Sequence, residues 1–391
     1  MQCDEAHPIC RLCAVSERGC SYSSNAPASG EQHAILAPSR LYLSNPAQPN
    51  GETVLDFNSA APLTPTSNAS SSGYPLNYNR YDATSDTALN FDHIELLVHA
   101  TQNSDLFSLG TAVGDYHSPG LALALNEALK APYLMHALLA FSAQHLAVLH
   151  PGRSSHYLHQ ATSLQTRAIS LFNASWTQVD ESNCVAALLF STVLGHQILA
   201  DALRKRDPGG LDVFIRHYVQ CVEMHRGIYT IASSTWPLLM QSGLGPILTL
   251  SRAFTSQPPV GHECDSLKDL VVGTKNLSQT QKDACLEVVR YLQVGLDAVA
   301  NTHVESRNRH QMICSLTMLI PSEVNDMLAK KQPEALILLA YYAVLLYHGR
   351  ELWQTRDAGV FIFGLVAGYL GDDWEPWMKY PREVIFGGRL T

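Results

Sequence analysis

A chain of 391 residues, 46% hydrophobic and 16% charged, is long enough to bury a large core and has the composition of a globular protein. Its formal net charge of −9 excludes strong attachment to DNA over the whole surface, because binding to phosphates needs an excess of lysine and arginine. Any contact with nucleic acid must therefore be local.

The first twenty residues contain four cysteines, Cys3, Cys10, Cys13 and Cys20, with the spacing C-x6-C-x2-C-x6-C. Thiolates two residues apart can bind one Zn²⁺ at about 2.3 Å each, whereas so short a segment cannot bury a core of its own. The alternative is four unpaired thiols at a frayed terminus. We predict that all four cysteines bind zinc, and that its role is structural because four thiolates leave no open position for a substrate.

The other cysteines indicate a reducing compartment, because they are scattered singly through predicted helices: Cys184, Cys221, Cys264, Cys285 and Cys314. The N-terminus lacks a basic segment followed by an apolar run, so no targeting signal is expected. The most apolar stretch, 335–347, is shorter than the roughly 20 residues that cross a bilayer. We therefore predict a buried core helix there and no membrane segment.

Composition divides the chain into three parts. Residues 1–22 form the cysteine module, and residues 23–88 are rich in Ser, Asn, Pro, Ala and Gly, which predicts a disordered linker. Residues 89–391 carry helical patterns and almost no alternation of the strand type. The sequence thus predicts an all-α domain of about 300 residues behind the linker.

Helix signals along this domain are local. Pro132 suits a first helical turn, Pro151 stops that helix, and the break at 207–210 follows a basic helix end. Gly243–Gly245 before Pro246 indicates a further helix break. Helices are predicted near 91–107, from Pro132 to Pro151, through 157–172, 180–206 and 214–225, and over 280–301, 322–330, 334–355 and 358–370.

The cysteine segment resembles the second half of a fungal six-cysteine binuclear zinc cluster. The resemblance lies in Cys3-Asp4-Glu5-Ala6-His7-Pro8-Ile9-Cys10-Arg11-Leu12-Cys13 and in the ending Gly19-Cys20-Ser21-Tyr22. It implies that the four cysteines are the third to sixth of that family, which shares two zinc ions among six thiolates and lays a short basic helix in the DNA major groove.

The first two cysteines of that pattern, and the basic run before the third, are absent from this sequence. We therefore expect the four remaining sulfurs to close a single tetrahedral site rather than the two-metal cluster. Within 1–22 only Arg11 and Arg18 offset Asp4, Glu5 and Glu17. A shortened gene model or an alternative start would account for the missing part.

The helical domain is similar to the regulatory domain of fungal zinc-cluster factors, in the branch with sterol-responsive regulators. The segments that carry this similarity are 132–147, 333–343 and 369–377. It implies an apolar small-molecule ligand within the helices.

Other motifs have simpler interpretations. Histidine pairs such as His145/His150 and His156/His159 are expected at the core edge or the surface, and no Gly-x-Ser-x-Gly, phosphate loop or dinucleotide fingerprint occurs, so catalysis is not expected. Basic residues 204–206 could form a nuclear-import patch, but a solvated helix end is the more economical interpretation. The aromatic set Trp353, Trp374, Trp377 and Tyr380 could line a pocket, but core packing is favoured.

The combined prediction is a nuclear, zinc-dependent regulator of RNA polymerase II transcription that binds promoter DNA and the transcription machinery. It could control a metabolite or lipid pathway, and homodimerisation is left open. The alternative is a ligand-sensing or protein-interaction regulator that has lost autonomous DNA binding.

Overall fold

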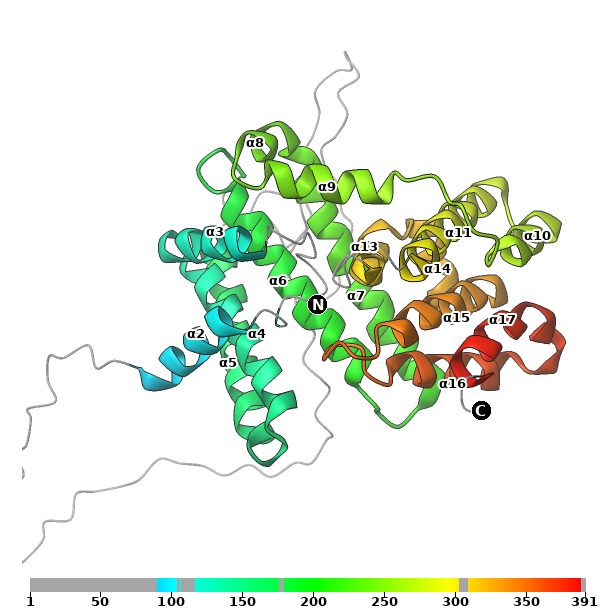
Figure 1. Ribbon diagram of the computed structural model, residues 1–391, viewed down its shortest axis with the longest axis horizontal. Coiled ribbons are helices and arrows are strands. Elements are labelled where there is room, and N and C mark those ends of the chain that lie inside the picture. The colour runs from blue at the N-terminus through cyan, green and yellow to red at the C-terminus, as the bar shows by residue number, and fades with distance from the viewer. Residues whose placement is uncertain (1–89, 104–105, 107–116, 176–178, 302–308, 388–391) are drawn as a thin grey trace, which may run out of the picture. The chain divides into compact units, whose positions relative to one another are not determined.

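The computed structural model describes residues 90–103, 106, 117–175, 179–301 and 309–387, and most of these residues lie in helices (Figure 1). These ranges hold fifteen α-helices, two 3-10 helices and no strand. The predicted all-α class is confirmed for them, and all of them fall within one compact unit.

Of the first six α-helices, all except α3 agree with the start and stop signals in the sequence. Pro132 opens its helix at the first turn, and a 3-10 turn at Pro151–Arg153 separates that helix from the next. The helices are α2 (Phe91–Gln102), α3 (His117–Lys130), α4 (Pro132–Leu149), α5 (Ser154–Ser175), α6 (Cys184–Arg204) and α7 (Gly210–Ser234).

The second part contains shorter helices around two long ones. Ser278 and Gln281 form a capping box that starts the longest of them, α11. The helices are α8 (Trp236–Gln241), α9 (Gly245–Thr255), α10 (Asp265–Gly273), α11 (Gln279–Ala300), α13 (Gln311–Leu319), α14 (Ser322–Ala329), α15 (Pro333–His348), α16 (Ala358–Leu370) and α17 (Glu375–Phe386).

The sequence did not predict six of these helices: α3, α8, α9, α10, α13 and α17. Most of them are short, and none begins with a side-chain cap hydrogen bond in the part described. Helix α17 even contains Pro381. The predicted 334–355 helix is also shorter, because the chain turns at Gly349 and continues as a loop to Asp357.

Helix α15 is the centre of the larger hydrophobic cluster. All residues from Glu334 to Leu346 are buried, as expected for a helix that is apolar on every side. It packs against α10, α11, α13, α14, α16 and α17, which surround it in Figure 1. The predicted core helix at 335–347 is confirmed.

Helices α6 and α7 pass from one hydrophobic cluster to the next. Near its start α6 packs with α3, α4 and α5 around Phe141 and Phe190, while its last turns pack with α7 in the cluster that contains α15. Among the described helices, α6 has the length and apolar composition of a membrane span, but 72% of its most apolar window is buried inside the fold. That burial is what a core helix would show.

The crossing of α15 and α16 requires a glycine. A Cβ atom on Gly359 would lie 2.5 Å from the carbonyl oxygen of Ala343 and 2.6 Å from the backbone nitrogen of Tyr347. Real Cβ atoms do not approach backbone so closely, and backbone cannot rotate away as a side chain can. The two helices therefore touch main chain to main chain at this point.

We predict that Gly359→Ala lowers the free energy of unfolding by about 1–3 kcal/mol, because the methyl group must push the two helices apart. Gly364→Ala on the same helix is the matched control, since nothing lies within 4 Å of its added Cβ atom. That variant should gain about 0.5–1 kcal/mol from helix propensity. Urea denaturation measures both, and equal effects at the two sites would contradict the close-contact explanation.

Candidate functional site

The four predicted zinc ligands, Cys3, Cys10, Cys13 and Cys20, lie outside the described residues, as do the module 1–22 and the linker 23–88. Zinc binding and these domain boundaries therefore stay predictions. In the described ranges, no group of three or more His, Cys, Asp or Glu side chains is placed to hold a metal ion.

The five cysteines of the helical domain are all buried and unpaired, as the sequence predicted. Burial raises the pKa of the Cys285 and Cys314 thiols to about 12, because a thiolate would lose its hydration. A thiol that stays protonated is a poor nucleophile. These cysteines therefore serve as small core residues rather than reactive groups.

Two of the cysteines meet buried histidines where α6, α7 and α13 come together. The Cys314 sulfur lies 3.4 Å from Nδ1 of His196, and the Cys221 sulfur lies 3.6 Å from Nδ1 of His225. The His225 ring also packs directly on Gly195, whose Cβ atom would lie 2.6 Å from it. The helices α6 and α7 can approach so closely only because position 195 has no side chain.

Burial keeps this centre neutral. It lowers the pKa of His196 to about 4, and burial together with the nearby His196 lowers the pKa of His225 to about 3. Because neither imidazole is charged near neutral pH and the thiols keep their protons, the cluster has no general acid or base of suitable strength. It is a polar core contact.

A second histidine pair joins α2 to α4. Nε2 of His99 and Nδ1 of His145 are 3.1 Å apart and share a hydrogen bond, and Trp353 stacks on His145 with ring centroids 4.9 Å apart. Sequence reasoning compared histidines within one helix and missed this pair, because its members are 46 residues apart. No local pattern could have indicated it.

The predicted aromatic set does not line one pocket. Trp353 is buried with Phe141 in the cluster around α4, where its Nε1 donates a hydrogen bond to the carbonyl oxygen of Leu106. The other three residues lie at the C-terminal end: Trp374 and Trp377 contact each other, and Tyr380 stacks on Tyr341. Core packing is therefore their role, as the sequence favoured.

The basic helix end at 204–206 makes intramolecular contacts. Arg206 donates hydrogen bonds to the carbonyl oxygen of Leu203 at 2.7 Å and to the carboxylate of Asp357 at 2.8 Å, and its guanidinium lies 4.0 Å from the centre of the Phe361 ring. Contact with the last carbonyls of α6 is the helix-end role that the sequence favoured.

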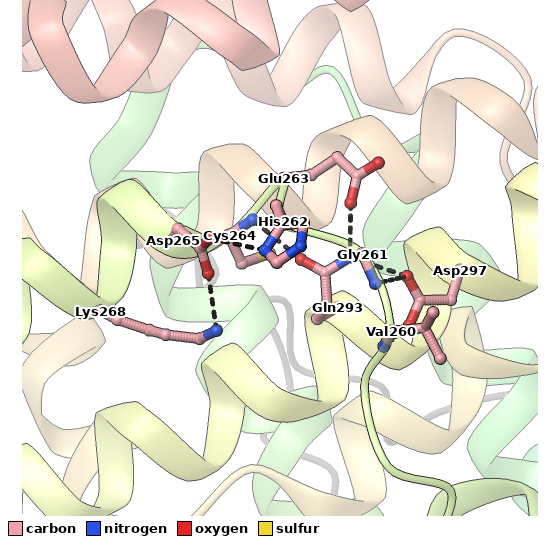
Figure 2. A network of polar contacts seen from close by, with 9 residues as sticks. All are labelled: Val260, Gly261, His262, Glu263, Cys264, Asp265, Lys268, Gln293 and Asp297. Atoms are coloured by element: carbon pink, nitrogen blue, oxygen red, sulfur yellow. Dashed lines mark hydrogen bonds and ion pairs between the residues drawn. The ribbon is translucent and has the colours of Figure 1, made fainter.

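A polar network fixes the loop before α10 onto α11 (Figure 2). The carboxylate of Asp297 accepts hydrogen bonds from the backbone N–H groups of Val260 and Gly261 at 2.7 and 2.9 Å. One turn earlier on α11, Gln293 accepts from the backbone N–H of Cys264 at 2.9 Å and donates to Asp297 at 2.8 Å. All these groups are used in holding the loop.

A cleft of about 340 Å³ opens between the end of α3 and α5 and the start of α4 and α6. Its apolar wall is formed by Ala131, Pro132, Tyr133, Leu171, Phe172, Ala186 and Ala187. Phe172 of this wall stacks on Phe190 behind it with ring centroids 4.4 Å apart, and both rings make edge contacts with Tyr133 at 5.2–5.3 Å. These ring contacts fix the side chains at the bottom of the cleft.

The polar residues of the cleft are Glu127, Lys130, Ser175, Ser182 and Asn183. Lys130 donates to Glu127 at 2.9 Å, with 73% of the lysine side chain exposed against 16% of the glutamate side chain. The residues of this cleft come from four segments, so no sequence motif marks it. The cleft has room for a small ligand, and the predicted apolar ligand stays a prediction.

The comparison with known proteins gives one distant relative. A protein of Gibberella zeae named "Zn(2)-C6 fungal-type transcription factor" is 24% identical to this chain over 427 aligned residues, which cover 98% of this chain and 83% of that protein. No family model and no solved structure matches the chain. The relative is named as a transcription factor, which is not an enzyme, in agreement with the missing catalytic motifs.

The neutral histidines at the α6–α7–α13 junction predict acid sensitivity. Below about pH 6.5 the unfolded chain binds protons at His196 and His225, while the folded protein does so only near pH 4 and 3. The contribution of these two neutral histidines to the free energy of unfolding is therefore fully present above pH 6.5. It falls as the pH drops toward 4, by up to about 1.4 kcal/mol per pH unit for each histidine.

Chemical denaturation at pH 7.5, 6, 5 and 4.5 measures this slope. The His196→Gln and His225→Gln variants should each show a shallower pH dependence, because glutamine does not titrate. His159→Gln is the control, since that histidine is exposed on α5. A slope unchanged in both core variants would contradict the assignment.

Proposed function

We propose that this protein is a zinc-dependent, sequence-specific regulator of RNA polymerase II transcription that acts in the nucleus. The observation that carries the proposal is the spacing of Cys3, Cys10, Cys13 and Cys20 in a chain that is similar, over almost its whole length, to a protein named as a Zn(2)-C6 transcription factor.

The donor set fits zinc rather than a harder cation. Four cysteine thiolates at short spacing are soft ligands that favour Zn²⁺ over Mg²⁺ or Ca²⁺. A full set of protein ligands gives the ion a structural role, in which it stabilises a segment that is too short to fold by itself. Promoter DNA and the transcription machinery are the partners in this proposal, and control of a metabolite or lipid pathway is its finer form.

A second candidate is a ligand-sensing or protein-interaction regulator without autonomous DNA binding. The net charge of −9 and the excess of acidic over basic residues in 1–22 favour it, because both oppose contact with phosphate. All five cysteines of the described residues are buried in the helical body, so zinc could reach them only if that body unfolded.

We expect the purified chain to contain roughly one zinc ion, since four thiolates complete one tetrahedral site. Atomic absorption should show loss of this zinc in the Cys10→Ser/Cys13→Ser double variant. Cys184→Ala, which changes a buried cysteine of the helical body, is the matched control and should keep the metal. A metal-free wild-type protein would defeat the zinc proposal.

A gel-shift titration at low and moderate salt separates the two candidate functions. The transcription regulator should bind selected DNA sites tightly, and its affinity should fall with salt as lysine and arginine contacts to phosphate are screened. Absence of sequence-selective binding by a zinc-loaded protein would favour the second candidate.

A further inference from the structure

We propose that the cleft between α4, α5 and α6 binds a small amphipathic anion, that is, an organic carboxylate with a compact apolar body. The regulatory meaning of such a ligand rests on the proposed function of the helical domain. The binding itself involves neither zinc nor DNA.

The size and lining of the cleft suit such a molecule. Its volume of about 340 Å³ lies in the range of small-molecule sites, which are mostly apolar with a few polar groups. Tyr133 lines the cleft, and its ring packs against the rings of Phe172 and Phe190. Because these rings are packed already, an apolar ligand would bind without first ordering the wall.

The polar rim favours a negative charge. A ligand that approaches from solvent meets the exposed ammonium group of Lys130 before the largely covered carboxylate of Glu127. A ligand carboxylate could therefore share the lysine with Glu127, whereas an amine would face a group of its own sign. Helix α4 begins at the cleft after Ala131, whose side chain cannot accept a hydrogen bond, so the start of its dipole adds positive partial charge to this side.

The hydroxyl of Tyr133 offers a further polar contact. No hydrogen bond is found for it in the part of the chain described, and burial together with the charge of Glu127 raises the pKa of this phenol. It thus keeps its proton and can donate a hydrogen bond to a ligand oxygen. One cation and one neutral donor beside an apolar wall match a carboxylate with a hydrocarbon or aryl body.

Calorimetric titration of the full chain with decanoate, decanol and decylamine tests the proposal. These probes share one apolar body and differ in charge. We expect saturable binding in the order decanoate, decanol, decylamine, and a loss of about two- to fivefold in decanoate affinity in Lys130→Gln with decanol affinity unchanged. Lys275→Gln, at an exposed lysine outside the cleft, should change neither.

A pair of neighbouring residues on α5 provides the steric test. Ser175 lines the cleft and donates only to carbonyl oxygens of its own helix, whereas the adjacent exposed Ala174 does not line it. Ser175→Trp should fill the cleft and weaken decanoate binding by about tenfold or more, while Ala174→Trp leaves it within about twofold. Ser182→Trp blocks the cleft from the α6 side if the first variant does not fold.

Three results would overturn the inference: no saturable binding of any probe, equal weakening by the two α5 variants, or equal affinity for decanoate and decanol. Thermal melting of the unliganded variants shows whether each one is folded. Zinc content and DNA binding are measured separately from ligand binding. A failure of the ligand titrations would therefore leave the proposed function standing, and a failure of the zinc or DNA measurements would leave the cleft assignment standing.

Discussion

Helix α15 has no side that faces solvent, and the arrangement of the C-terminal helices follows from this constraint. A helix of sixteen residues that is apolar all round needs neighbours in every direction, and α10, α11, α13, α14, α16 and α17 provide them. At Gly359 the packing is so close that the backbone of α16 touches the backbone of α15. Short helices with little intrinsic stability, such as α13 and α14, form because α15 and α11 give them an apolar surface.

Sequence reasoning succeeded where the signal was local and strong. Pro132, Pro151 and the apolar run at 335–347 placed α4, the turn after it and α15, because each of these signals acts within its own segment. Helices such as α13 and α17 were missed because tertiary packing rather than periodicity stabilises them. Long-range polar contacts could not be predicted from the sequence for the same reason. His99 lies next to His145 only because α2 packs on α4.

The two candidate sites also differ in how far the sequence alone can indicate them. The cysteine spacing can be read directly from residues 1–22, since the four predicted zinc ligands lie close together in the chain. The cleft combines residues from four helices, of which Lys130, Tyr133, Ser175 and Asn183 are examples, and no spacing connects them. The resemblance suggested an apolar ligand within the helices, but it gave neither the place of a site nor the exposed ammonium group at its rim.

Electrostatics gives the helical body a simple internal organisation. The histidines and cysteines at the junction of α6, α7 and α13 are neutral, while most of the ion pairs described, such as those of Lys130 and Arg206, lie at the surface. Net negative charge therefore acts outward, where it opposes contact with phosphate over the domain as a whole. Contact with DNA would therefore have to be local, at a surface whose charge differs from that of the molecule as a whole.

The network in Figure 2 has a mechanical consequence. The stretch between α9 and α10 contains Pro258, Pro259 and Gly261 and would pass for a pliable connection, yet Gln293 and Asp297 from adjacent turns of α11 hold its backbone. We expect this stretch to act as a rigid connection. A displacement of α9 would then move α11, and through α11 also α15, because the hydrogen bonds prevent the loop from changing its conformation independently.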